Sequence, residues 1–66
     1  MLDAGQIIKM CRHHLKWSTI KLSVESEVSK STIQEIEANK RDCRLSTFEK
    51  ILNSMGYEIE VLRTDE

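Results

Sequence analysis

The chain has 66 residues, of which 39% are hydrophobic and 32% are charged, with no proline and two cysteines. This length allows one small domain with a thin core. Two cysteines cannot form a disulfide framework, so free thiols in a reducing compartment are expected. No apolar run reaches membrane-spanning length and no signal peptide is visible, so the sequence predicts a cytoplasmic protein without a membrane partner.

Charge is distributed unevenly along the chain, although the formal net charge is only −1. Between Lys9 and Arg44 there are eight Lys or Arg residues and five Asp or Glu residues, whereas from Glu58 onward there are one and four. The basic stretch suits a nucleic-acid partner, and the acidic end can lie away from it. The low net charge predicts modest affinity for each monomer and a need for a dimer.

The first predicted helix begins at a capping box formed by Asp3 and Gln6 and continues to about Leu15. In a capping box, each side chain accepts a hydrogen bond from the other residue's backbone N–H. Trp17, the only tryptophan, follows this helix and is expected to fill the core between the first two helices.

Three residues of the first helix invite a metal-binding interpretation, namely Cys11, His13 and His14. Only Cys11 and His14 share a helix face, and Cys43 is the one further candidate ligand, so the ligand pairs of a structural zinc site are missing. Cys11 is instead expected to pack as a small hydrophobic residue on the apolar stripe. No metal site is predicted.

Residues 18–37 predict two short helices joined by a tight turn. Ser18 and Ser29 can each cap one of these helices, because a serine oxygen accepts a hydrogen bond from a backbone N–H of the first turn. In the first of the two helices Leu22 is the inward apolar residue, and the small Ser23 would let another helix approach closely.

The second helix of this pair is predicted over residues 30–38, with Ile33 and Ile36 on one apolar stripe. Asn39 follows it and tolerates the left-handed backbone of a helix C-terminus. The opposite face of the helix is polar and carries Lys30, Ser31, Gln34 and Glu35. An ordinary helical hairpin with a solvated face is the plain alternative, but the paired caps and the short turn argue against it.

Both ends of this helix pair carry residues of the types and at the spacing of a known sequence pattern. They are Ser18, Thr19, Leu22, residues 28–33, Ile36, Glu37 and residues 39–41. With these residues the chain resembles the phage-repressor/Cro-type (XRE-like) helix-turn-helix family, over about residues 8–56. The resemblance implies a mainly α, four-helix domain over residues 1–56. Its second paired helix, the recognition helix, enters the DNA major groove while the first braces it.

The sequence departs from the family pattern at three positions. Thr19 stands where Gln is usual, which weakens one expected phosphate contact. Glu27 stands where Gly is common in the turn, so a non-glycine residue is expected at positive φ, at a cost of roughly 1 kcal/mol. Asn39 replaces another common Gly, which is a milder change.

The resemblance and the polar helix face together assign DNA contacts. Lys30 can donate to guanine O6 and N7, and Glu35 can accept from the cytosine N4 amino group. The alternative for Glu35 is a simple ion pair with a nearby Lys. Base contacts are expected from Lys30, Ser31, Gln34 and Glu35. Phosphate contacts are expected at helix starts and in the basic loop, from Ser18, Thr19, Ser29, Thr32, Asn39, Lys40, Arg41 and Arg44. Arg41 or Arg44 could instead reach the minor groove.

The resemblance also implies a buried structural ion pair between Arg12 in the first helix and Glu37 at the end of the recognition helix. Such a pair would fix one helix against the other. The alternative is two exposed charges that contribute little to stability.

The last helix is predicted to begin at a second capping box, formed by Ser46 and Glu49, and to end near Met55, with Gly56 as its stop. Its apolar stripe would face the core. The stripe consists of Phe48, Ile51, Leu52 and Met55.

Residues 57–66 change from helical spacing to strict alternation, which predicts a β-strand. Tyr57, Ile59 and Val61 share one face, and Glu58 and Glu60 share the other. Because a lone strand has no partner, we expect it to pair with the same strand of a second copy, which gives a homodimer. This end is similar to that of HipB-type antitoxins. The alternative is an extended tail.

No catalytic constellation and no Gly-rich phosphate loop are present, so the sequence predicts neither an enzyme nor a cofactor or small-molecule ligand. The function expected is that of a sequence-specific DNA-binding regulator. It would be a homodimeric repressor of a phage, plasmid or toxin–antitoxin operon that binds double-stranded DNA at a palindromic operator. One alternative is an antitoxin that neutralises a toxin protein and uses DNA binding for autoregulation. Another is an interaction module that has lost DNA binding.

Overall fold

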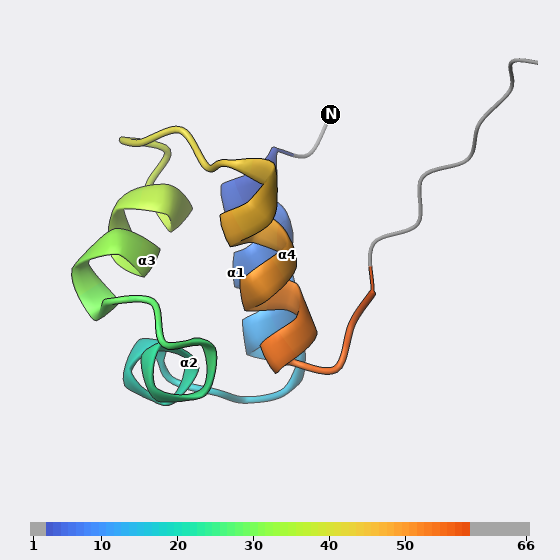
Figure 1. Cartoon of the computed structure of the whole chain (residues 1–66). Coiled ribbons are helices and arrows are strands. Elements are labelled where there is room, and N and C mark those ends of the chain that lie inside the picture. The colour runs from blue at the N-terminus through green and yellow to red at the C-terminus, as the bar shows by residue number, and fades with distance from the viewer. Residues whose placement is uncertain (1–2, 59–66) are drawn as a thin grey trace, which may run out of the picture.

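The computed structural model describes residues 3–58. This part of the chain is helical, with α1 (Ala4–His14), α2 (Thr19–Ser26), α3 (Lys30–Glu37) and α4 (Leu45–Ser54) in chain order (Figure 1). The prediction of a mainly α, four-helix domain is confirmed. Of the predicted strand, Ile59 and Val61 lie outside the described residues. None of these four helices has the length and apolarity needed to cross a membrane.

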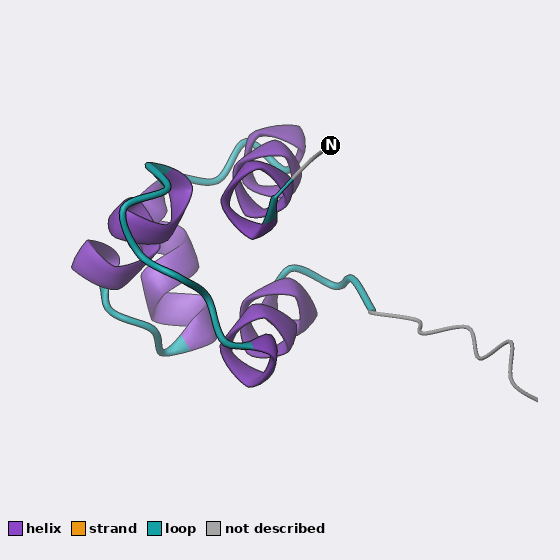
Figure 2. Cartoon of the chain, turned by 90° about the horizontal axis from the view of Figure 1, so that it is seen from above, coloured by secondary structure: helices purple, strands orange, loops and turns teal. Residues whose placement is uncertain are grey.

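The four helices surround one core (Figures 1 and 2). Helix α1 packs against α3 and α4, and α2 packs against the same two helices. Every helix contributes to the core because each has an apolar stripe at helical spacing. The buried apolar residues are Ile8, Leu22, Ile33, Ile36, Ile51, Leu52 and Met55. Trp17 and Phe48, the latter from the predicted α4 stripe, are half-buried and pack against this core.

Three of the four helix starts follow the predicted capping chemistry. Asp3 and Gln6 form the predicted capping box at α1. Ser18 accepts a hydrogen bond from the N–H of Lys21 over 3.0 Å at α2. Ser29 similarly accepts from the N–H of Thr32 over 3.2 Å at α3. These three predictions from the sequence are confirmed.

The predicted start of the last helix is wrong. Helix α4 begins at Leu45, so Ser46 is already inside it, and Arg44 occupies the N-cap position without a side-chain hydrogen bond. The first helical hydrogen bond runs from the N–H of Phe48 to the carbonyl of Arg44 over 2.9 Å. Because this bond already closes a helical turn at Arg44, Ser46 has helical backbone and cannot take the extended conformation of an N-cap residue.

Helices α1, α3 and α4 are each followed, one position after the C-cap, by a residue in the left-handed region. These residues are Lys16 (φ 61°), Asn39 (φ 60°) and Gly56 (φ 88°). After α3, the N–H of Asn39 donates to the carbonyl of Ile36 over 3.0 Å, and the N–H of Lys40 donates to the carbonyl of Glu35 over 2.9 Å. This is the Schellman motif, which satisfies carbonyls at the helix end and reverses the chain.

Helix α2 also ends at a left-handed residue, Glu27, with a φ of 62°. The predicted positive φ at Glu27 and the left-handed cap at Asn39 are therefore confirmed. Lys16 was not predicted, because lysine has no preference for this backbone region that the sequence could reveal.

The buried small residue of α2 is Ser26 rather than the half-buried Ser23. Ser26 is 2% exposed. Its hydroxyl donates to the carbonyl of Leu22 over 2.7 Å and accepts from the N–H of Val28 over 3.2 Å. A buried polar group with both roles filled carries no desolvation penalty from an unmade bond. Ser26 thereby fixes the turn that leads from α2 into α3.

Helix α1 approaches the end of α3 closely at Gly5, which the sequence reasoning did not single out. Gly5 is buried in α1. A Cβ at this position would collide with the backbone carbonyl oxygen of Ile36 and would lie 3.2 Å from the Cα of Glu37. Both neighbours are backbone atoms, so they cannot move aside as a flexible side chain would.

We expect Gly5→Ala to lower the free energy of unfolding by about 1–3 kcal/mol, the usual cost of overpacking a core. Alanine alone favours a helix over glycine by about 1 kcal/mol, so the sign of the change tests the close contact. Urea unfolding measures it, with the exposed Lys9→Ala on the same helix as the control. A Gly5→Ala protein more stable than the wild type would contradict this packing.

Candidate nucleic-acid interface

Helix α3 separates its residues into an inward and an outward face. Ile33 and Ile36 are 0% and 3% exposed, because they fall on the stripe that faces the core. The four side chains predicted to contact bases all lie exposed on the rest of the helix surface, namely Lys30, Ser31, Gln34 and Glu35. They are therefore available to a partner without any change in the core.

Two helix starts present groups suited to anions. The first N–H groups of a helix have no partner within the helix, and the helix dipole places partial positive charge there. At α2 this start carries exposed Ser18 and half-buried Thr19, and at α3 it carries exposed Ser29. Thr32, in the first turn of α3, is half-buried. The chemistry suits phosphate oxygens.

The segment after α3 adds further polar and basic groups. Asn39, Lys40 and Arg44 are exposed, in the loop that the left-handed Asn39 turns away from the helix axis. Arg41 lies in the same loop but is placed differently, because its side chain is hydrogen-bonded to α3.

Arg41 joins two side chains of the outer α3 surface. Its Nη1 donates to Oε1 of Glu35 over 3.0 Å and to Oγ1 of Thr32 over 3.3 Å. The hydroxyl of Ser29 also donates to Oγ1 of Thr32, over 2.8 Å. We call these four residues the Arg41 network. The sequence suggested a lysine as the partner of Glu35, whereas the structure shows Arg41. The one feature of the sequence that could have indicated Arg41 is the chain reversal expected at Asn39, which turns the following loop back toward α3.

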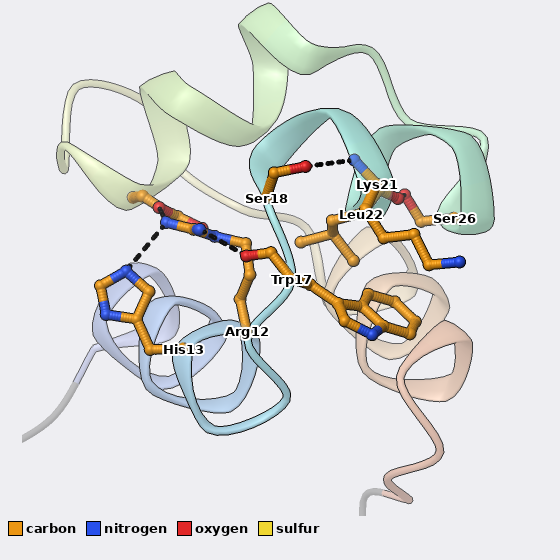
Figure 3. A network of polar contacts seen from close by, with 8 residues as sticks. Arg12, His13, Trp17, Ser18, Lys21, Leu22 and Ser26 are labelled. Atoms are coloured by element: carbon orange, nitrogen blue, oxygen red, sulfur yellow. Dashed lines mark hydrogen bonds and ion pairs between the residues drawn. The ribbon is translucent and has the colours of Figure 1, made fainter.

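A second arginine ties α1 and α3 together (Figure 3). Arg12 Nε donates to Glu37 Oε2 over 2.8 Å, and Nη2 donates to Glu37 Oε1 over 2.9 Å. Its Nη1 donates to the carbonyl of Trp17 over 2.9 Å, and Nη2 lies 3.3 Å from Nε2 of His13. The ammonium of Lys21 lies 5.2 Å from the centre of the Trp17 ring.

The Arg12–Glu37 pair is shielded from water, with side-chain exposures of 11% and 8%. The hydrogen bond to Glu37 raises the pKa of the Arg12 guanidinium above its ordinary value. The pair is bidentate, which is the stronger geometry for arginine and carboxylate. It joins α1, the α1–α2 connection and the end of α3.

The two carboxylates of α3 are thus both bound by arginines, Glu35 by Arg41 and Glu37 by Arg12. Within residues 3–58, Lys30 forms no ion pair. The outer surface of α3 consequently presents a positive charge at its start and compensated negative charge further along. This arrangement reduces the repulsion that a polyanion would meet.

The cysteines are half-buried free thiols in this part of the chain. Burial raises the pKa of the Cys11 and Cys43 thiols. Among residues 3–58, no three His, Cys, Asp or Glu side chains gather as a metal site would need.

We expect Arg12→Ala to lower the free energy of unfolding by about 3–5 kcal/mol, because Glu37 would keep a shielded charge without its partner. The matched control is Glu25→Ala, which breaks the Lys21–Glu25 pair at 3.2 Å, where the side chains are 49% and 43% exposed. That control should cost under about 1 kcal/mol. Urea unfolding that gives equal losses for the two variants would show that the Arg12 pair is energetically ordinary.

Comparison with known families agrees with this geometry. A family model described as helix-turn-helix matches residues 8–62, which include all four helices except the first turn of α1. No curated protein and no solved structure gives a significant match. The chain belongs to the XRE-type helix-turn-helix family, a family of DNA-binding regulatory domains.

Proposed function

We propose that this DNA-binding transcriptional regulator is a homodimeric repressor, which acts in the cytoplasm by covering a palindromic operator and blocking polymerase access. The exposed polar face of α3, with its carboxylates compensated by Arg41 and Arg12, carries this proposal. Such a face can enter the major groove while α2 braces it. The bases would be contacted by Lys30, Ser31, Gln34 and Glu35.

Phosphate contacts would flank this face. The capped starts of α2 and α3 offer N–H groups and hydroxyls, and the loop after α3 offers two further cations. These contacts set the register of the protein on DNA and supply most of the salt-dependent affinity. The residues assigned are Ser18, Thr19, Ser29, Thr32, Asn39, Lys40 and Arg44. Arg41, also predicted at the phosphates, differs from these residues because its side chain is bonded to α3.

We expect Lys30→Ala and Ser31→Ala to weaken binding to the preferred operator by about 1–3 kcal/mol and to relax the preference at particular base pairs. Fluorescence anisotropy with an operator substituted one base pair at a time measures this. Lys40→Ala is the control. This variant should weaken binding to every DNA sequence by the same factor and reduce the salt dependence of binding by about one phosphate contact. Uniform weakening by Lys30→Ala as well would assign Lys30 to phosphate.

Dimerisation would use residues 57–66 as a segment separate from the domain of residues 1–56. Tyr57 follows the left-handed Gly56 and is half-buried against the core. Pairing of the segment with its copy would place Tyr57, Ile59 and Val61 against the helical bodies. A two-fold dimer matches a palindromic operator, with recognition helices about 34 Å apart.

We expect Ile59→Lys to give a monomer with weak, nearly non-specific DNA binding, because a charge would enter the apolar face of the paired strands. The matched control is Glu60→Lys, which changes the adjacent residue on the alternate face and should leave the dimer intact. Light scattering measures the mass of each. A dimeric Ile59→Lys protein would place the interface elsewhere.

An antitoxin role is the second candidate, and exposed apolar residues of α2 favour it. Ile20 and Val24 lie one helical turn apart and are 57% and 68% exposed. They offer a surface for a protein partner outside the α3 face. If Ile20→Lys abolishes toxin neutralisation in the native host and leaves operator binding unchanged, the antitoxin role is supported. Affinity purification of the protein from its native host that recovers DNA but no toxin partner favours the plain regulator.

A further inference from the structure

Glu35 poses a problem for a DNA-reading helix, because a carboxylate is repelled by the phosphates on both sides of the groove. In the major groove the base donors that it can accept from are the amino groups at cytosine N4 and adenine N6. A solitary Glu35 would lose its hydration there while gaining one hydrogen bond. Arg41 changes this balance, since its Nη1 already lies 3.0 Å from Glu35 Oε1.

We propose that Glu35 and Arg41 read one C·G base pair as a unit, which rests on the proposed placement of α3 in the major groove. Glu35 would accept from cytosine N4, and Arg41 would donate to guanine O6 or N7. In the base pair, cytosine N4 and guanine O6 lie side by side in the major groove, as the Glu35 carboxylate and the Arg41 guanidinium do beside α3. Both N–H groups of Arg41 Nη1 are used by Glu35 and Thr32, so Nη2 or Nε would supply the N–H for guanine.

The Arg41 network holds the guanidinium ready for this role. Two acceptors about one turn apart on α3, Thr32 and Glu35, bind the same nitrogen, and Ser29 in turn binds Thr32. The remaining guanidinium N–H groups still have donor capacity. The side chains of Arg41 and Glu35 are 52% and 50% exposed, so each has free surface for a base edge. Less side-chain freedom is then lost on binding.

The same exposure separates this role from a role in folding. An exposed ion pair contributes little to stability in water, so removal of either side chain should leave the fold intact. In the groove, where water is displaced, the loss of Arg41 would leave Glu35 facing the phosphates unpaired. Arg41 is thus a specificity-determining residue that acts both on guanine and through Glu35.

The experiment uses the full chain. The preferred site of the wild type is selected from a random duplex library, and its affinity is measured with every single base-pair change. Glu35→Ala, Arg41→Ala and the double variant are then measured on the same set. At one and the same C·G base pair, the preference for C·G over the other base pairs should fall about tenfold in each single variant. The double variant should lose no more than either single variant.

Lys40→Ala is the matched control for Arg41, because it removes a cation from the same loop. If Arg41→Ala, like Lys40→Ala, weakens all sequences equally and lowers the salt dependence, Arg41 contacts phosphate and the reading unit is overturned. Independent effects at two different base pairs overturn it as well. A wild type that selects no sequence at all would overturn the proposed function itself. Urea unfolding of each variant confirms that binding losses do not come from unfolding.

Discussion

The shielded ion pair between Arg12 and Glu37 is the interaction on which the position of α3 depends. Its guanidinium makes two bonds to Glu37 and one to the carbonyl of Trp17, so it joins three segments at one point. Ion pairs of this kind add little net stability compared with apolar packing, but they penalise any arrangement that separates the partners. The Arg12 pair therefore specifies one orientation of α3, and the close contact at Gly5 reinforces it from the same helix.

Ion pairing also explains how a chain with a net charge of −1 can present a surface for DNA. Three of the five acids between Lys9 and Arg44 are held by cations, in the pairs of Glu25, Glu35 and Glu37. What a polyanion meets is the local arrangement of charge within about a Debye length, roughly 8–10 Å, more than the sum over the chain. Net charge is thus a weak guide here, and the paired acids of α3 matter more.

Most of the helical framework was predictable, because local rules decide it. The caps at Asp3, Ser18 and Ser29 and the left-handed residues Glu27 and Asn39 depend on a few neighbouring atoms. What could not be predicted depends on contacts between segments. The start of α4, the close approach at Gly5 and the partner of Glu35 are such cases. The predicted base-reading residues were found exposed on α3, but the bond from Arg41 to Glu35 required the loop geometry.

Helix α3 is held by groups that leave its outward residues uncommitted. Its end is fixed by Arg12 and by the backbone contact at Gly5, and the turn before it is fixed by Ser26. The outward side chains can therefore change without loss of the core, which separates the chemistry of this face from the stability of the fold. Arg41 is the exception, because it joins the loop to Glu35 on the outward face. A change in that loop would therefore alter the outward face of α3, although no residue of the helix itself had changed.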